Sequence, residues 1–98
     1  MLHTVNKSPF QNNTLESCQK FITSGDIILL IEDGVYGAMA GSAKSAIVEG
    51  AIKSGTEVYA LSSDLKARAI TNLIDGVQIT DYAGFVDFVE KHKTHSWL

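Results

Sequence analysis

An unbroken run of five apolar residues, Ile-Ile-Leu-Leu-Ile at positions 27–31, constrains the fold of this chain more than any other feature of its sequence. A strand that is apolar at every position suits the middle of a parallel sheet, because helices cover both faces of such a sheet. The run stops abruptly at the polar turn Glu32-Asp33-Gly34. We therefore predict that residues 27–31 form a central strand of a parallel sheet.

Shorter strand-like and helix-like segments alternate along the rest of the chain. Further strands are predicted at residues 2–5, 58–61 and 76–80, the first and last of these nearer the edges of the sheet. This alternation with short links indicates an α/β fold, a small parallel sheet flanked by helices. Helices are predicted from Asn13 to Gly25, from Ser42 to Gly55, over a short span from Ser62, and from Asp81 onward, where Phe85, Phe88 and Val89 repeat at helical spacing. The inner face of the second helix is predicted to consist of Ala43, Ala46, Ile47, Gly50 and Ala51.

The length of 98 residues accommodates one domain, residues 1–98. With 45% apolar and 19% charged residues, the composition is that of a globular protein. A chain of this size buries roughly 60–65% of its unfolded surface, so its own core is thin. Association with other subunits would therefore be an ordinary way to gain stability.

Several classes of protein are excluded by what the sequence lacks. No apolar run approaches the roughly 18–20 residues of a membrane helix. The first residues, Met-Leu-His-Thr, have neither the basic segment nor the apolar core of a signal peptide. A single cysteine forms no internal disulfide. We therefore expect a cytoplasmic protein. The chain has one arginine, and its lysines are scattered among eleven acidic residues, which argues against direct binding to nucleic acid.

Four carboxylates, Glu32, Asp33, Asp64 and Asp81, fall near the carboxyl ends of the predicted strands, where α/β sheets bind ligands. Negative charge there disfavours a nucleotide phosphate, and no glycine-rich phosphate motif is present. One interpretation is a divalent-metal site of the receiver-domain kind, but no lysine ends a strand as that site requires. The favoured interpretation is a turn at Asp33 and helix caps at Asp64 and Asp81.

Cys18 is the only candidate sulfur nucleophile. It shares a helical stripe with Leu15 and Ile22, which favours an inert, buried thiol, because reactive cysteines need exposure and a nearby cation. Lys20 and His3 are the cations that would tune it.

Two features near the carboxyl terminus admit alternative interpretations. His92 and His95 are spaced to share one helical face, which admits a metal site, but a solvated helix end is simpler because no third ligand is evident. The large apolar residues Trp97 and Phe10, in a tail and a loop, either fold back on the core or anchor a partner.

Five segments of the sequence form a specific set, although each alone is a weak signal. They are Leu2-His3-Thr4-Val5-Asn6-Lys7-Ser8-Pro9-Phe10, Leu15-Glu16-Ser17-Cys18, Glu32-Asp33-Gly34-Val35-Tyr36, Asp64-Leu65-Lys66-Ala67-Arg68 and Asp81-Tyr82-Ala83-Gly84-Phe85-Val86-Asp87. Together they resemble the DsrH/TusB family, and the resemblance extends to Trp97-Leu98.

The resemblance implies a DsrEFH-like, flavodoxin-like fold. It also implies a cytoplasmic dimer of heterotrimers with two sister chains, one DsrE/TusD-like and one DsrF/TusC-like. Such complexes relay persulfide sulfur to a small carrier. The carrier is TusE in the branch leading to 2-thiolation of the tRNA wobble uridine, and DsrC in the branch that oxidises stored sulfur. The essential persulfide cysteine belongs to the DsrE/TusD chain, so the resemblance implies a non-catalytic subunit, and we expect no cofactor or metal.

Cys18 lies where DsrH proteins of sulfur oxidisers carry a cysteine, which favours the oxidation branch and makes Cys18 a candidate secondary sulfur-binding residue. A TusB-like role in tRNA thiolation and a stand-alone sulfurtransferase using Cys18 are the alternatives. Partner contacts are predicted at Ser8, Pro9, Phe10, Glu32, Asp33, Gly34, Tyr36 and Trp97.

Overall fold

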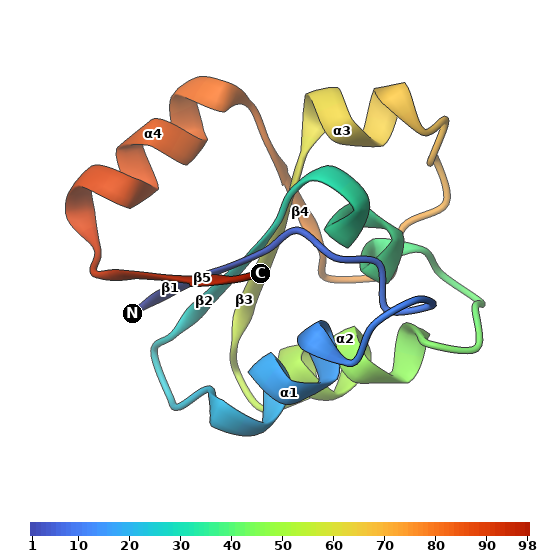
Figure 1. Cartoon of the computed structure of the whole chain (residues 1–98), viewed down its shortest axis with the longest axis horizontal. Helices are drawn as coiled ribbons and strands as arrows, with labels where there is room; N and C mark the ends of the chain where they lie inside the picture. The colour runs from blue at the N-terminus through green and yellow to red at the C-terminus, as the bar shows by residue number, and fades with distance from the viewer.

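The five strands of this protein form one parallel sheet in the order β4-β3-β2-β1-β5 (Figure 1). The computed structural model describes all residues, 1–98. The apolar run at 27–31 lies at the centre of the sheet, as predicted, so the α/β fold class is confirmed. The strands are β1 (Leu2–Val5), β2 (Ile27–Leu30), β3 (Glu57–Leu61), β4 (Gln78–Thr80) and β5 (Thr94–Trp97).

Helices cover the two faces of the sheet unequally. The helices are α1 (Thr14–Phe21), α2 (Ser45–Lys53), α3 (Ser62–Ala67) and α4 (Tyr82–Lys91), with a 3-10 helix, η1 (Glu32–Ala38), after β2. Figure 1 shows α1 and α2 on one side of the strands and α4 on the other. We call these sides the α1/α2 face and the α4 face. None of the helices is long and apolar enough to cross a membrane.

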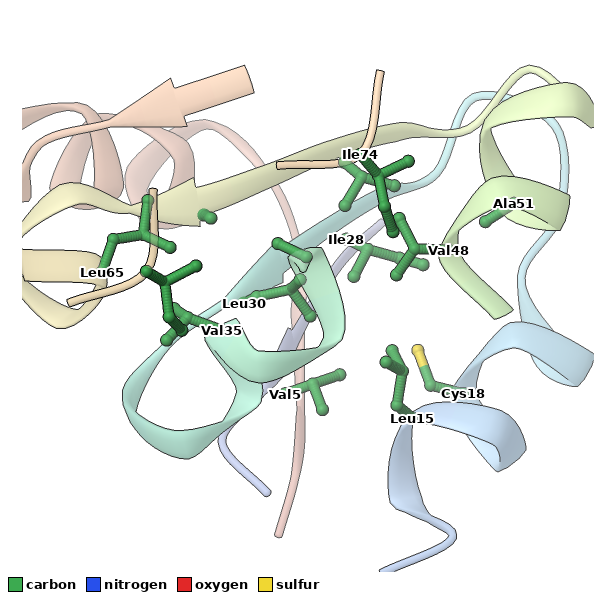
Figure 2. Packing of buried hydrophobic residues seen from close by; sticks show 14 residues of the cluster. Val5, Leu15, Cys18, Ile28, Leu30, Val35, Val48, Ala51, Leu65 and Ile74 are labelled. Carbon is green, nitrogen blue, oxygen red and sulfur yellow. The ribbon is translucent and has the colours of Figure 1, made fainter. Parts of the chain in front are cut away.

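Successive residues of β2 point to opposite faces, because side chains alternate along a strand. Ile28 and Leu30 belong to a cluster of 14 buried residues on the α1/α2 face, drawn in Figure 2. Leu29 belongs to a cluster of only three buried residues on the α4 face, against which Phe85 and Phe88 of α4 pack. Both clusters use the same strand, so the continuous apolar run is explained by burial on both sides.

The strand β5 is the main departure from the sequence prediction. The helix that contains Phe85 ends at Lys91, His92 is already extended, and residues 94–97 pair in parallel with β1. The prediction that His92 and His95 share a helical face is therefore wrong. Backbone pairing with β1 stabilises this short polar segment, and its side-chain pattern carries no signal for that pairing. Because β5 forms the edge, β1 is an interior strand, one position from that edge of the sheet.

Smaller differences concern where elements begin and what they bury. The second helix begins at Ser45 because residues 42–44 form a turn in which the Lys44 backbone N–H donates to Ser42 Oγ. Its buried residues are Ser45, Val48 and Ala51, so of the predicted inner face only Ala51 is fully buried. Residues 32–38 form a 3-10 helix where a loop was expected.

Candidate functional site

The chain's only thiol lies in the interior. Cys18 is fully buried on α1, in the same cluster as Leu15 and Val48, and Figure 2 shows it beside Leu15. Burial, with a smaller contribution from the negative charge of Asp26, raises the pKa of Cys18 to about 12. Because the thiolate is the nucleophile, a thiol with this pKa is inert at neutral pH. The prediction of an interior thiol is confirmed.

The loops after β1 and β2 meet at the carboxyl edge of the sheet, the usual position of ligand sites in α/β folds. They enclose a hollow of about 330 Å³ lined by Ser8, Phe10, Gln11, Asp33 and Tyr36. We call it the carboxyl-edge hollow. Four of its five lining residues were predicted as partner contacts from two separate segments, and the fold brings them together.

Two local structures position the walls of the carboxyl-edge hollow. Ser8 closes a turn, since its hydroxyl accepts a hydrogen bond from the Phe10 backbone N–H at 3.2 Å and its carbonyl accepts from Gln11 and Asn12. Gly34 lets η1 lie directly on β1, because a Cβ at this position would overlap the carbonyl oxygen of Val5. The glycine of the Glu32-Asp33-Gly34 turn is therefore required by close packing.

The two aspartates beside the hollow, Asp33 and Asp64, pair with the side chain of Arg68. Arg68 donates from Nε to Asp33 at 2.9 Å and also pairs with Asp64 at 3.5 Å. Asp64 Oδ2 accepts a 2.7 Å hydrogen bond from the backbone N–H of Glu32. Asp64 thus ties η1 to α3, and the expectation that it caps its own helix is wrong. This pairing was not predicted, because Arg68 is distinctive in the sequence only as the single arginine.

Asp81 caps α4 as predicted, because its carboxylate accepts a 2.8 Å hydrogen bond from the backbone N–H of Gly84. No three His, Cys, Asp or Glu side chains in the chain gather closely enough to hold a metal ion.

A second polar cluster lies beside β1, apart from the carboxyl-edge hollow. His3, almost fully buried, has its Nε2 2.9 Å from Asp26 Oδ2, while the indole Nε1–H of Trp97 donates to His3 Nδ1 at 3.1 Å. The Trp97 ring also lies 5.8 Å from Phe21 and 4.7 Å from His95, centroid to centroid. Trp97 therefore folds back on the core, one of the two outcomes considered for it.

Asp26 is the charged centre of this second cluster. Burial alone would raise its pKa, but hydrogen bonds from His3, from the Thr23 backbone N–H and from the amino terminus hold the pKa well below its usual range. The carboxylate therefore stays ionised at all ordinary pH values. Sequence analysis missed this cluster; the signal was a polar residue, His3, inside an otherwise buried strand.

Comparison with known proteins supplies the family. The profile of the family described as "DsrH like protein" matches residues 7–95. The chain belongs to the DsrH-like family. The TusB proteins of Photorhabdus laumondii, Serratia proteamaculans and Escherichia coli K12 are 38%, 35% and 34% identical to it over 93, 99 and 93 residues. Those alignments cover 94%, 99% and 94% of this chain, and 94%, 100% and 94% of the TusB proteins.

Two solved structures share the fold of this DsrH-like chain. The ychN protein of E. coli superposes with a TM-score of 0.76 at 14% identity, covering 95% of this chain and 94% of ychN. The MTH1491 protein of Methanobacterium thermoautotrophicum gives 0.78 at 14% identity, covering 97% of this chain and 96% of the other. At such identity the likeness extends to the fold alone.

The predicted contact residues of the DsrH-like chain differ in accessibility. Ser8, Pro9 and Gly34 are buried, whereas Glu32 and Asp33 are exposed and Phe10 is 47% exposed. Only the second group presents its side chains freely to a partner. Contact with a partner remains a prediction for all of them.

Proposed function

We propose that this chain is a non-catalytic subunit of a cytoplasmic sulfur-relay complex, assembled with one DsrE/TusD-like and one DsrF/TusC-like sister chain. The observation that carries the proposal is the similarity to TusB proteins at 33–38% identity along nearly the whole chain. The complex exchanges persulfide sulfur with a small carrier of the DsrC/TusE type. The chain contributes surface and shape, and the sister chain contributes the reacting cysteine.

The environment of Cys18 supports a role by docking. A persulfide relay needs a thiolate that a donor and an acceptor can both reach. Cys18 offers neither condition, since it is fully buried and its pKa is raised to about 12. This is the reason for rejecting the stand-alone sulfurtransferase, whose only available nucleophile would be this thiol.

The carboxyl-edge hollow is the proposed contact region. Phe10 exposes 47% of its surface there, and an exposed aromatic ring is a typical anchor of protein interfaces. Asp33, which also lines the hollow, is paired with Arg68 at 2.9 Å, so its carboxylate is presented in a fixed position. A rigid wall with one aromatic anchor suits recognition of another protein.

The names of the relatives bear on which branch of the family applies. All the curated relatives cited above are TusB proteins, which supports 2-thiolation of the tRNA wobble uridine over oxidation of stored sulfur. The presence of Cys18 favoured the oxidation branch. Because this thiol is buried, it cannot exchange sulfur with a carrier, and its presence no longer favours that branch. The oxidation role stays a prediction that the experiments below test.

The decisive experiment co-expresses the tagged chain with its two sister chains. We expect a stoichiometric complex, a persulfide on the DsrE/TusD-like chain, and sulfur transfer to the carrier that persists in the Cys18→Ala variant. A monomer indifferent to both sisters would contradict the proposal. So would sulfur transfer by the isolated chain that Cys18→Ala abolishes.

The contact region is tested by Phe10→Ala, with Tyr82→Ala as the matched control, because Tyr82 is an exposed aromatic residue on the remote helix α4. We expect Phe10→Ala to weaken co-purification with the sisters or the carrier while leaving the melting temperature unchanged. If both variants co-purify equally well with the sisters and the carrier, the contact region does not include Phe10.

The branch is tested in a bacterium that lacks its own TusB. Supplying this chain together with its sisters is expected to restore 2-thiouridine in tRNA, measured by mass spectrometry of nucleosides. If the assembled complex does not restore it but does exchange sulfur with a DsrC-type carrier, the oxidation branch holds.

A further inference from the structure

The edge strand β5 is held by its backbone ladder to β1 and by few side-chain contacts. The side chains of Thr94, His95 and Ser96 are exposed, and only Trp97 is partly buried. Trp97 lies at a hollow of about 480 Å³ whose other lining residues are Met1, His3, Phe21 and His95. Apart from the backbone ladder to β1 and a 3.3 Å hydrogen bond from Thr4 Oγ1 to Ser96 Oγ, the position of the strand therefore depends on how the Trp97 indole is held.

The hydrogen bond that holds the indole requires a particular protonation state of His3. An indole N–H is a donor only, so His3 Nδ1 must offer a lone pair to the Trp97 Nε1–H, 3.1 Å away. The ring proton then lies on Nε2, which donates to Asp26 Oδ2 at 2.9 Å. The neutral Nε2–H tautomer is the only form of the imidazole that satisfies both contacts.

The other charged groups around His3 decide what happens when it gains a proton. Asp26 stays ionised, because its pKa lies well below its usual range, and it also holds the Met1 ammonium group at 3.1 Å. Cys18, on α1, stays a neutral thiol. His95 of β5 has its ring centroid 6.2 Å from that of His3. The ionised Asp26 stabilises an imidazolium at His3, so protonation is electrostatically feasible in the folded protein.

We propose that His3 and Trp97 form a proton-sensitive latch on the strand β5. A proton taken from solvent binds the lone pair of His3 Nδ1, and two N–H donors then face each other where one hydrogen bond existed. The Trp97 indole leaves its position beside His3 and Phe21, β5 loosens, and the backbone edge of β1 is uncovered. Binding of one proton breaks the Trp97–His3 hydrogen bond, and uncovering β1 then also breaks the backbone ladder between β1 and β5. The proposal does not depend on the sulfur-relay function.

The latch can be followed directly, because Trp97 is the only tryptophan of the chain. Histidine is the side chain that titrates between about pH 5 and 8, so we expect a one-proton red shift of Trp97 emission in that range and about a twofold rise in acrylamide quenching. The helical signal in far-UV circular dichroism should be retained, which separates unlatching from global unfolding. Labelling this chain alone with 5-fluorotryptophan lets 19F NMR report the same event inside an assembly.

Two variants form the control pair. His3→Asn keeps an acceptor near the position of Nδ1 but cannot titrate, so the transition should disappear with Trp97 docked at all pH values. His95→Gln removes the neighbouring histidine that makes no hydrogen bond to Trp97, and the transition should remain. A transition that persists in His3→Asn, or that His95→Gln abolishes, would overturn the latch.

A measurement on the unmodified protein keeps the test independent of variant folding. Long-range 1H–15N NMR of the histidine rings should show His3 protonated only at Nε2 at pH 8 and at both nitrogens in the unlatched state. A proton on Nδ1 at pH 8, or Trp97 emission that stays constant from pH 8 to 5, would equally overturn the proposal.

Discussion

The two faces of the sheet are built very differently although they share the same strands. The α1/α2 face has a cluster of 14 buried residues, to which α1, α2, η1 and α3 contribute side chains. The α4 face has three, and α4 itself contains no fully buried residue. The comparison shows that packing is concentrated on one side of the sheet and that the other side is covered by a single helix.

The topology explains this inequality. From β1 to β4 the chain steps through neighbouring strands in one direction, and right-handed crossovers place all the connecting helices on the same face. Only the connection from β4 to β5 runs back across the sheet, so the handedness places α4 on the opposite face. Because only one connection runs in this direction, only one helix covers the α4 face.

The sharpest test of the comparison uses two adjacent leucines of β2, both fully buried. Leu30→Ala opens a cavity in the large cluster, and we expect a loss of about 4 kcal/mol in the free energy of unfolding. Leu29→Ala opens one beneath α4, which can shift inward to fill it, so about 2 kcal/mol is expected. Urea unfolding measures both, and equal losses would show that the faces are equally rigid.

The next effect concerns the close approach of η1 to β1 on the α1/α2 face. Gly34→Ala forces a Cβ into the Val5 carbonyl, a backbone atom that cannot turn aside, and about 2–3 kcal/mol of destabilisation is expected. Gly50→Ala is the matched control, because its Cβ would meet only the flexible end of Gln19. That variant should be stabilised by about 0.5–1 kcal/mol, since alanine favours the helix.

Asp26 tests the polar anchor beside the α1/α2 face. Asp26→Asn should cost about 2 kcal/mol at pH 7, because it weakens the hydrogen bonds from His3 and the amino terminus. The pKa of Asp26 is lowered on folding, so this stability is present above the unfolded value near 3.9 and is lost as pH falls through the folded value. The difference between wild type and variant should shrink below about pH 4; a constant difference would contradict this.

The smallest effect is expected on the outside of α4. Val89 is 43% exposed, so Val89→Ser should change the free energy of unfolding by less than about 0.5 kcal/mol. A thermal melt measures this. A larger loss would mean that the α4 face contributes more packing than its burial indicates.

Much of the architecture could be predicted because it depends on local patterns. The run at 27–31, the stripe through Leu15 and Cys18, and the cap at Asp81 each carry a period or a residue type with a physical meaning. The strand β5 could not be predicted, because Thr94, His95 and Ser96 face solvent and their pairing depends on a strand about ninety residues earlier.

The candidate site divides in the same way. The predicted loops around Ser8 and Asp33 do meet, as the common edge of a parallel sheet requires. The pairing of Arg68 with Asp33, 35 positions away, and of Trp97 with His3, 94 positions away, has no counterpart in spacing. Such contacts are visible only once the chain has folded.

The order of residues alone determined the strand–helix alternation, the central strand, the interior position of the lone thiol and the family, because each is encoded in short-range pattern or in the identity of many residues together. The tertiary structure decided which residues become partners: the fifth strand, the unequal faces and the His3–Trp97 contact. The physical reason is that hydrogen bonds and burial depend on distance in space, which crossovers and long-range pairing establish independently of distance along the chain.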